Sequence, residues 1–261
     1  MGCCASAEKP KETTVIENVP EKEFLACLGA EKIAKDCRII MAIDVMAGEE
    51  GDGSKHATLE PPNLNPYERA LALSTDVLRQ SRDGKVPLYF FGSREANEYK
   101  QSRGALPVGV AEVKNGSAQQ LVDLYRGAVA KQTGEAMYDF RHLLYLAMKK
   151  IEESRQFTVL VVFFGGGTLR NVPSTKVCLE RLANLPVSVV CVGIGDGDFS
   201  IMQELDKLED RAVDNFHFMR MSDVLCKDGV RAQKAAFLHQ AFMEVPAQYR
   251  AFKERIGYEP Q

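Results

Sequence analysis

The chain has 261 residues, of which 45% are hydrophobic, and its formal net charge at pH 7 is −3. A chain of this length and composition can bury a full core, and because it lacks a basic excess we expect no nucleic-acid partner. No apolar run approaches the roughly 20 residues that span a bilayer, and the N-terminus has no signal-peptide core, which predicts a cytosolic protein.

The first six residues, Met1-Gly2-Cys3-Cys4-Ala5-Ser6, match the N-myristoylation pattern M-G-x-x-x-[ST] once Met1 is removed. Cys3 and Cys4 directly follow Gly2, where palmitoylation can add a second chain. One myristoyl chain binds a membrane only marginally, whereas a second acyl chain makes retention stable. We therefore predict lipidation at Gly2, Cys3 and Cys4 and a peripheral, lipid-anchored protein at the cytoplasmic face of a membrane. The alternative is an accidental Gly-Cys-Cys start with unmodified thiols.

Residues 1–20 are expected to form this acylated tail and a linker, and residues 21–261 one domain that ends in C-terminal helices. Short apolar runs predict strands at 39–43, 86–91, 157–164, 187–194 and 213–218, with an edge strand at 106–110. Apolar residues at spacings of three and four predict helices at 21–35, 65–78, 117–130, 138–151, 174–182, 199–208 and 231–255, the last interrupted at Pro246. Because strands and helices alternate, the connection rules predict an α/β fold with a doubly wound, mostly parallel central sheet flanked by helices.

The apolar run 39–43 ends at Asp44, and a glycine-rich polar loop follows it. In a parallel sheet this pattern indicates a buried central strand whose carboxyl end directs the acid to the crevice where ligands bind. The loops at 44–48, 133–137 and 164–168 are expected to meet at that edge of the sheet. The alternative is a core strand that ends at a solvated aspartate.

Three glycines, Gly165-Gly166-Gly167, follow the most strand-like run of the chain, and glycine-rich loops after strands can bind phosphate. The chain contains neither G-x-G-x-x-G nor G-x-x-x-x-G-K-[ST], and after this loop no basic side chain precedes Arg170. The alternative function from the enzyme class is a nucleotide- or phosphate-binding protein that uses this loop. His142 lies in a predicted helix and His217 in a predicted strand, and both are interpreted as structural.

Several stretches share a pattern with one known family: Ile43-Asp44, Asn65-Pro66-Tyr67-Glu68-Arg69-Ala70-Leu71, Phe91-Gly92, Leu185-Pro186-Val187-Ser188-Val189-Val190, Val192-Gly193-Ile194-Gly195-Asp196-Gly197, Met202-Gln203-Glu204, Asp214-Asn215-Phe216 and Glu244-Val245-Pro246-Ala247-Gln248-Tyr249. Together they resemble the copine-type A domain, a branch of the von Willebrand factor A fold. The similarity is greatest to the version in myristoylated RING-type ubiquitin ligases, and it covers about residues 21–257. It implies a von Willebrand factor A / Rossmann-like fold, in agreement with the alternation of strands and helices.

The resemblance also implies a metal-ion-dependent adhesion site built from three loops, which supply Asp-x-Thr/Ser-x-Ser, then Thr, then Asp. Such oxygen ligands suit Mg²⁺. This chain retains Asp44, but Met46, Gly48, Ala136 and Gly165 occupy the other ligand positions. The site is therefore expected to be vestigial, with no metal and no cofactor; an A domain that still binds Mg²⁺ is the alternative. Zinc is not expected, because the seven cysteines include no C-x-x-C pair.

We therefore expect a non-catalytic, lipid-anchored scaffold that binds protein partners and reaches the membrane through its N-terminal acyl chains. Ligase activity is not expected, because the zinc ligands of a RING do not follow Cys226. Without a cation to attract an acidic partner, the apolar side chains of Met46, Met137 and Phe164 are candidates for a partner-binding edge. In the alternative, Phe164 and Met46 turn inward and fill the place of the cation.

Overall fold

The structure is a computed structural model that describes residues 37–45, 56, 63–75, 81, 84–92, 110–114, 117–130, 139–166, 169–209 and 211–257. The strands of the central sheet are β1 (Arg38–Asp44), β2 (Lys85–Phe91), β3 (Val110–Lys114), β4 (Thr158–Phe164), β5 (Val187–Gly193) and β6 (Phe216–Arg220). The described helices are α3 (Pro66–Leu73), α6 (Ala118–Val129), α7 (Arg141–Ser154), α8 (Val172–Leu182), α9 (Ser200–Asp206), α10 (Met221–Leu225), α11 (Val230–Phe242) and α12 (Val245–Ile256). The helix predicted at 21–35 lies outside the described residues.

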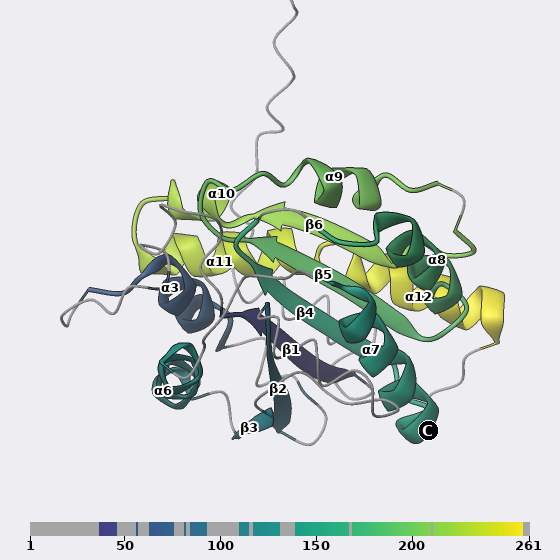
Figure 1. The fold of residues 1–261 in the computed structure, drawn as a ribbon, viewed down its shortest axis with the longest axis horizontal. Coiled ribbons are helices and arrows are strands. Elements are labelled where there is room, and N and C mark those ends of the chain that lie inside the picture. Colours follow the sequence, from purple (N-terminus) through teal and green to yellow (C-terminus); the bar gives the residue numbers. More distant parts are fainter. Residues whose placement is uncertain are drawn as a thin grey trace, which may run out of the picture.

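The six strands form one sheet in the order β3-β2-β1-β4-β5-β6 (Figure 1). Neighbouring strands from β2 through β6 are parallel, and β3 pairs antiparallel with β2 at one edge. This arrangement confirms the predicted α/β fold with a mostly parallel, doubly wound sheet. Parallel strands end at the same edge, so the carboxyl ends of β1, β4 and β5 lie beside one another.

Residues 106–109 of the predicted edge strand lie outside the described residues. Two strands differ from their predicted bounds by more than one residue: the edge strand continues to Lys114 rather than ending at 110, and β6 covers Phe216–Arg220 rather than 213–218. The reason for the later start of β6 is Arg211, whose buried guanidinium donates to the side chains of Asp214 and Asn215 at 2.7 and 2.9 Å. These bonds hold 211–215 in an irregular turn before the strand ladder starts.

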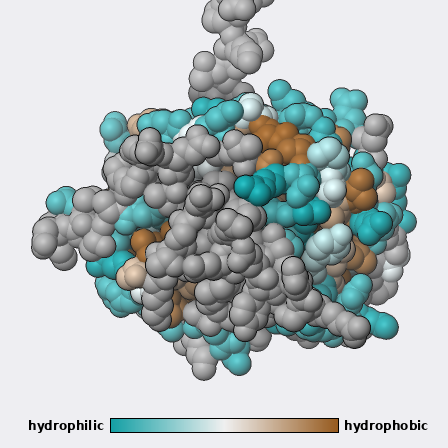
Figure 2. All heavy atoms as spheres, in the orientation of Figure 1, coloured by the Kyte–Doolittle hydropathy of each residue, from teal (hydrophilic) through white to brown (hydrophobic). Residues whose placement is uncertain are grey.

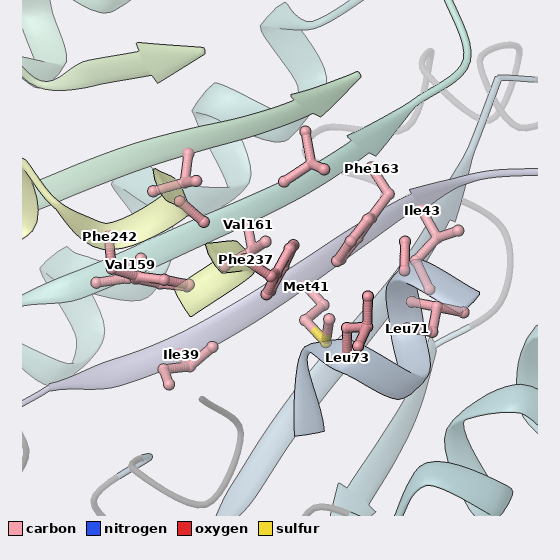
Figure 3. Packing of buried hydrophobic residues seen from close by; sticks show 14 of the residues in the cluster. Ile39, Met41, Ile43, Leu71, Leu73, Val159, Val161, Phe163, Phe237 and Phe242 are labelled. Atoms are coloured by element: carbon pink, nitrogen blue, oxygen red, sulfur yellow. The ribbon is translucent and has the colours of Figure 1, made fainter. Parts of the chain in front are cut away.

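Helices cover both faces of the sheet (Figure 1). On one face, Ile39, Met41 and Ile43 of β1 pack with side chains of α3, α6, α11 and α12, and Figure 3 shows Phe237 and Phe242 of α11 beside the strands. On the other face, Ile40 and Ala42 pack with side chains of α7, α8 and α9. A strand buried on both faces reads as a continuous apolar run, which explains why β1, β4 and β5 were predictable from sequence.

The start of α3 is the best-defined local structure near the site. The side chain of Asn65 accepts a hydrogen bond from the Glu68 backbone N–H at 2.8 Å, and the Asn65 backbone N–H donates to the Glu68 carboxylate at 3.0 Å. Pro66 occupies the first turn, where a missing N–H has no cost. This capping box fixes where the helix begins, and therefore where Tyr67 lies.

The described surface is mainly hydrophilic in the view of Figure 2, and its hydrophobic residues lie in separate areas. The most exposed large hydrophobic side chains are Leu64, Tyr145, Val177, Val230 and Met243. Scattered exposed side chains of this kind are normal for a folded domain. None of the helices in the described part of the chain combines the length and apolar character that crossing a bilayer requires.

Candidate functional site

Asp44, the last residue of β1, lies at the carboxyl edge of the sheet as predicted, but it is completely buried rather than solvated. Its Oδ2 atom accepts a hydrogen bond from the Tyr67 hydroxyl at 3.1 Å and another from the Gly165 backbone N–H at 3.2 Å. The first donor comes from α3, and the second follows β4. Asp44 therefore joins two segments that are 23 and 121 residues away from it in the sequence.

Tyr67 is held in place by a group of stacked rings. Its ring centroid lies 4.3 Å from that of His56 and 5.7 Å from that of Tyr125, and both pairs are nearly parallel. His56 Nδ1 lies 2.6 Å from the Tyr125 hydroxyl oxygen. Burial raises the pKa of Tyr125 far above its ordinary value, and the charges of Glu68 and Asp44 act in the same direction, so this hydroxyl stays neutral. Because Tyr67 is fully buried in this stack, its hydroxyl cannot turn away from Asp44 at low cost.

The position of α3 beside Asp44 depends on the buried carboxylate of Glu68. Glu68 is fully buried, and Arg126 of α6 donates to its carboxylate from Nε at 2.5 Å. With the capping bonds from Asn65, the carboxylate has a donor on each oxygen. A buried carboxylate without such partners would be strongly destabilising, so this pairing is what allows α3 to pack close to the sheet edge.

Gly165 stands where the resemblance places the third-loop aspartate, and the structure shows why a side chain does not fit there. A Cβ atom at this position would lie 2.7 Å from the Tyr67 hydroxyl oxygen and 3.3 Å from Asp44 Oδ2. The first distance is shorter than any normal contact. The Tyr67 hydroxyl thus occupies the space next to Asp44 that a side chain at 165 would need.

Phe164, a candidate for the partner-binding edge, is completely buried, so its expected exposure is wrong. Its ring makes edge-to-face contacts with Phe140 and Phe199 at centroid distances of 5.2 and 6.3 Å. Phe140 also contacts Phe91, and Phe199 also contacts Phe218. We refer to these five rings as the aromatic row. Phe164 thus turns inward, as in the alternative, but its ring packs against these phenylalanines, and Met46, the other residue of that alternative, lies outside the described residues.

The remaining predicted site residues lie outside the described residues. These are the lipidation residues Gly2, Cys3 and Cys4, the ligand positions Met46, Gly48 and Ala136, and the partner-binding candidate Met137. Asp139 is the first described residue after 131–138, the segment that contains the predicted second loop. Burial raises the pKa of Asp139, but the hydrogen bonds and charges of Arg141 and His142 lower it more, so it lies well below its ordinary value. The ionised Asp139 pairs with Arg141 at 2.6 Å.

The phosphate-binding alternative is not supported by the part of the glycine loop that is described. The Gly165 N–H, which would have to face a phosphate, donates to Asp44 instead. A Cβ at Gly166 would lie 2.8 Å from the Gly197 Cα, because the loops after β4 and β5 are in direct backbone contact. The two loops therefore close against each other at this point rather than forming a cradle.

Both histidines interpreted as structural lie in the elements predicted for them. His142 is in α7, and its Nε2 lies 3.6 Å from the Asp139 carboxylate. His217 is in β6, donates from Nε2 to the Gln240 carbonyl oxygen at 2.7 Å, and places Nδ1 3.0 Å from the Glu244 carboxylate. Among the described residues, no group of three or more His, Cys, Asp or Glu side chains is placed to hold a metal ion.

Sequence reasoning missed Tyr67 as a member of the site. Its place in the apolar stripe of the predicted helix indicated only a core position. One signal was available, because a buried tyrosine hydroxyl usually needs a hydrogen-bond partner, and an acid at a strand end can supply one. The sequence alone does not identify which acid that is.

Comparison with known proteins agrees with the resemblance. The family model described as Copine matches residues 54–261. The chain is 29% identical over 235 residues to the E3 ubiquitin-protein ligase RGLG1 of Arabidopsis thaliana. This alignment covers 82% of this chain and 47% of RGLG1. It is 26% identical over 199 residues to Copine family protein 2 of Caenorhabditis elegans, which covers 76% of this chain and 2% of that protein. The chain thus spans about half the length of the plant relative and a small part of the nematode one.

A solved structure is also similar. The von Willebrand factor type A protein from Catenulispora acidiphila superposes with a TM-score of 0.42 at 16% identity, covering 78% of this chain and 43% of that one. The family model matches well over half of the residues, from the loop after β1 to the C-terminal end of the sequence. The chain therefore belongs to the copine family.

Proposed function

We propose that the protein is a lipid-anchored, non-catalytic protein-interaction domain whose metal-ion-dependent adhesion site is degenerate. Membership of the copine family supports a role in protein interaction. The observation on which the proposal rests is the buried carboxylate of Asp44, whose Oδ2 atom is bonded to the Tyr67 hydroxyl and the Gly165 N–H. The place expected for a cation is thus completed by the chain's own donors.

The donor set does not fit Mg²⁺. This cation requires oxygen ligands in near-octahedral geometry and usually keeps several of its waters. Asp44 is the only one of the five implied ligand positions with a side-chain oxygen, since Met46, Gly48, Ala136 and Gly165 have none. Asp44 is also fully buried, and two N–H or O–H groups point at one of its oxygens, which is the opposite of an open, hydrated cation site.

Isothermal titration of the metal-free protein with MgCl₂ and MnCl₂ tests this part of the proposal. We expect no saturable heat, and in a parallel NMR titration no shift of the Gly165 amide signal. Asp44→Asn is the matched control, because it keeps the shape of the side chain and an acceptor oxygen while removing the charge. A saturable signal that Asp44→Asn abolishes would instead establish the alternative, a Mg²⁺-dependent A domain.

The membrane anchor is proposed from the N-terminal sequence. A Gly2→Ala variant is expected to be released to the cytosol, whereas Cys3→Ser with Cys4→Ser is expected to remain weakly and reversibly bound. A single myristoyl chain gives an association constant on the order of 10⁴ M⁻¹, which is too small for stable retention. Fractionation of cells that express the three forms gives the answer, and a fully membrane-bound Gly2→Ala form would contradict the anchor.

We also propose that protein partners bind at the carboxyl edge, where the sequence places Met46 and Met137. Met46→Asp and Met137→Asp are the variants that probe an apolar contact there. The ligase activity named for RGLG1 belongs to that protein, of which this chain matches about half. We do not transfer it, because the match leaves the other half of RGLG1 without a counterpart in the aligned residues.

A further inference from the structure

Arg220 is the last residue of β6 and lies in register with Gly193, the last residue of β5. It is therefore at the carboxyl edge of the sheet, the same edge that contains Asp44. Side chains alternate along a strand, so Arg220 shares a face with Phe216 and Phe218, which pack in the core on the α9 side. On this face of β6, the apolar side chains of Phe216 and Phe218 are thus followed by the cationic side chain of Arg220 at the carboxyl end of the strand.

The guanidinium of Arg220 has a built support. Its central carbon lies 5.5 Å from the ring centroid of Phe199, a distance at which cation and ring attract. Phe199 is itself buried between Phe164 and Phe218 in the aromatic row. A Cβ at Gly193 would lie 3.0 Å from two atoms of the Phe199 ring, so the missing side chain at 193 lets the ring lie against β5. Core packing therefore fixes the ring that supports the guanidinium.

Arg220 differs from Arg126, Arg141 and Arg211 in having no oxygen partner in the described part of the chain. Arg126, Arg141 and Arg211 each pair with a carboxylate, at 2.5, 2.6 and 2.7 Å. The Nε atom of Arg220 is buried without a hydrogen-bond partner, and no ion pair joins Arg220 to a residue in the described part of the chain. The nearby Asp198 accepts the Ser200 N–H at 2.9 Å, and the charge of Arg220 contributes to lowering the pKa of Asp198 without forming an ion pair with it. The buried Nε–H of Arg220 would therefore gain a hydrogen bond if an external acceptor bound there.

The surroundings decide which acceptor fits. Asp198 and a second acid, Asp196, are exposed in the loop that follows β5 at this edge. Their charges repel a phosphate dianion or an anionic membrane surface more strongly than a singly charged carboxylate, and either of the first two would meet only one arginine. A single carboxylate matches the planar fork of one guanidinium with two parallel hydrogen bonds.

We propose that Arg220 is a recognition residue that receives the side-chain carboxylate of an acidic residue on a protein partner. This inference rests on the proposed function as a protein-interaction domain. It adds an ionic contact at the same edge, supplied by a fixed arginine and not by a bound cation.

The test is an NMR titration of the full, non-acylated chain that observes the arginine Nε–H signals. The buried Nε–H of Arg220 is protected from exchange with water, and an Arg220→Lys variant identifies its signal. The probe is a capped Gly-Glu-Gly peptide, which carries one carboxylate, with capped Gly-Gln-Gly as the neutral control. We expect the Arg220 signal to shift saturably with Gly-Glu-Gly, with millimolar affinity, and not to shift with Gly-Gln-Gly.

The variants separate recognition from a structural role. Arg220→Lys keeps the charge but loses the fork, so Gly-Glu-Gly binding measured on the Gly193 and Phe199 amides should weaken about tenfold. Arg231→Lys, at an exposed position on α11, should bind as the wild type does. An unshifted Arg220 signal, an unchanged affinity in Arg220→Lys, or a stronger response to inorganic phosphate or phosphatidylserine vesicles would overturn the proposal. Because the sample has no acyl chain and no metal, failure of the anchor or of the metal prediction leaves this result unaffected.

Discussion

Tyr67 and Gly165 should be energetically coupled, because the tyrosine hydroxyl occupies the space of a side chain at 165. In Gly165→Ala the new Cβ would lie 2.7 Å from that hydroxyl, and the buried Tyr67 cannot swing out to relieve the contact. Overpacking of this kind costs about 1–3 kcal/mol. Tyr67→Phe alone removes a hydrogen bond to a carboxylate and should cost about 1.5–3 kcal/mol.

In the double variant the worst contact is gone, because the next ring atom, the Tyr67 Cζ, lies at an ordinary 3.7 Å from the added Cβ. The losses in unfolding free energy of the two single variants should therefore add up to about 1–2 kcal/mol more than the loss of the double variant. A coupling of this size is typical of residues in contact. Urea denaturation of the four proteins gives the free energies of unfolding. Gly166→Ala is the control: its clash is with the Gly197 backbone and its φ is +91°, so Tyr67→Phe should not rescue it. Additivity of Gly165→Ala and Tyr67→Phe within about 0.5 kcal/mol would refute the reasoning.

Three further predictions follow from the described contacts. Burial lowers the pKa of His217, but the carboxylate of Glu244 and other neighbours raise it more, so the net shift is upward. Its contribution to stability should be fully present below about pH 6.5 and lost as the pH rises through the raised pKa, and Glu244→Gln should flatten this part of a denaturation profile. Asp44→Ala should cost about 1–3 kcal/mol, equally with and without EDTA, because it removes a buried acceptor and no metal; a chelator-dependent cost would contradict it. Gly193→Ala should lower the thermal midpoint, because its Cβ would press on the ring of Phe199, and an unchanged midpoint would count against the rigid support.

The central strands were predictable because burial on both faces leaves a continuous apolar run, as in β1 and β4. The start of β6 was not, since Val213 is apolar and buried like a strand residue. What delays the strand is a set of polar bonds from Arg211, and a sequence pattern of apolar residues does not contain them. The C-terminal end of the edge strand β3 was also missed, because an edge strand has one neighbour and a weak apolar pattern.

Part of the site was also predictable from sequence, and part was not. The sequence placed Asp44 at a strand end and Gly165 beside it, and the structure joins them through one hydrogen bond. The exposure of Phe164 was mistaken. The prediction counted this residue both as the end of the strand 157–164 and as the start of the loop 164–168, and its ring lies in the aromatic row. Tyr67 could not be assigned to Asp44, because their contact depends on how α3 packs across the sheet edge.

The aromatic row has a consequence for how this edge of the domain opens. The rings of Phe91, Phe140, Phe164, Phe199 and Phe218 touch in succession, and they come from β2, the start of α7, β4, the segment before α9, and β6. One ring in such a series cannot leave its place without releasing the next. Amide hydrogens at the carboxyl ends of β2, β4 and β6 should therefore exchange with solvent at one common free energy, as a single cooperative unit.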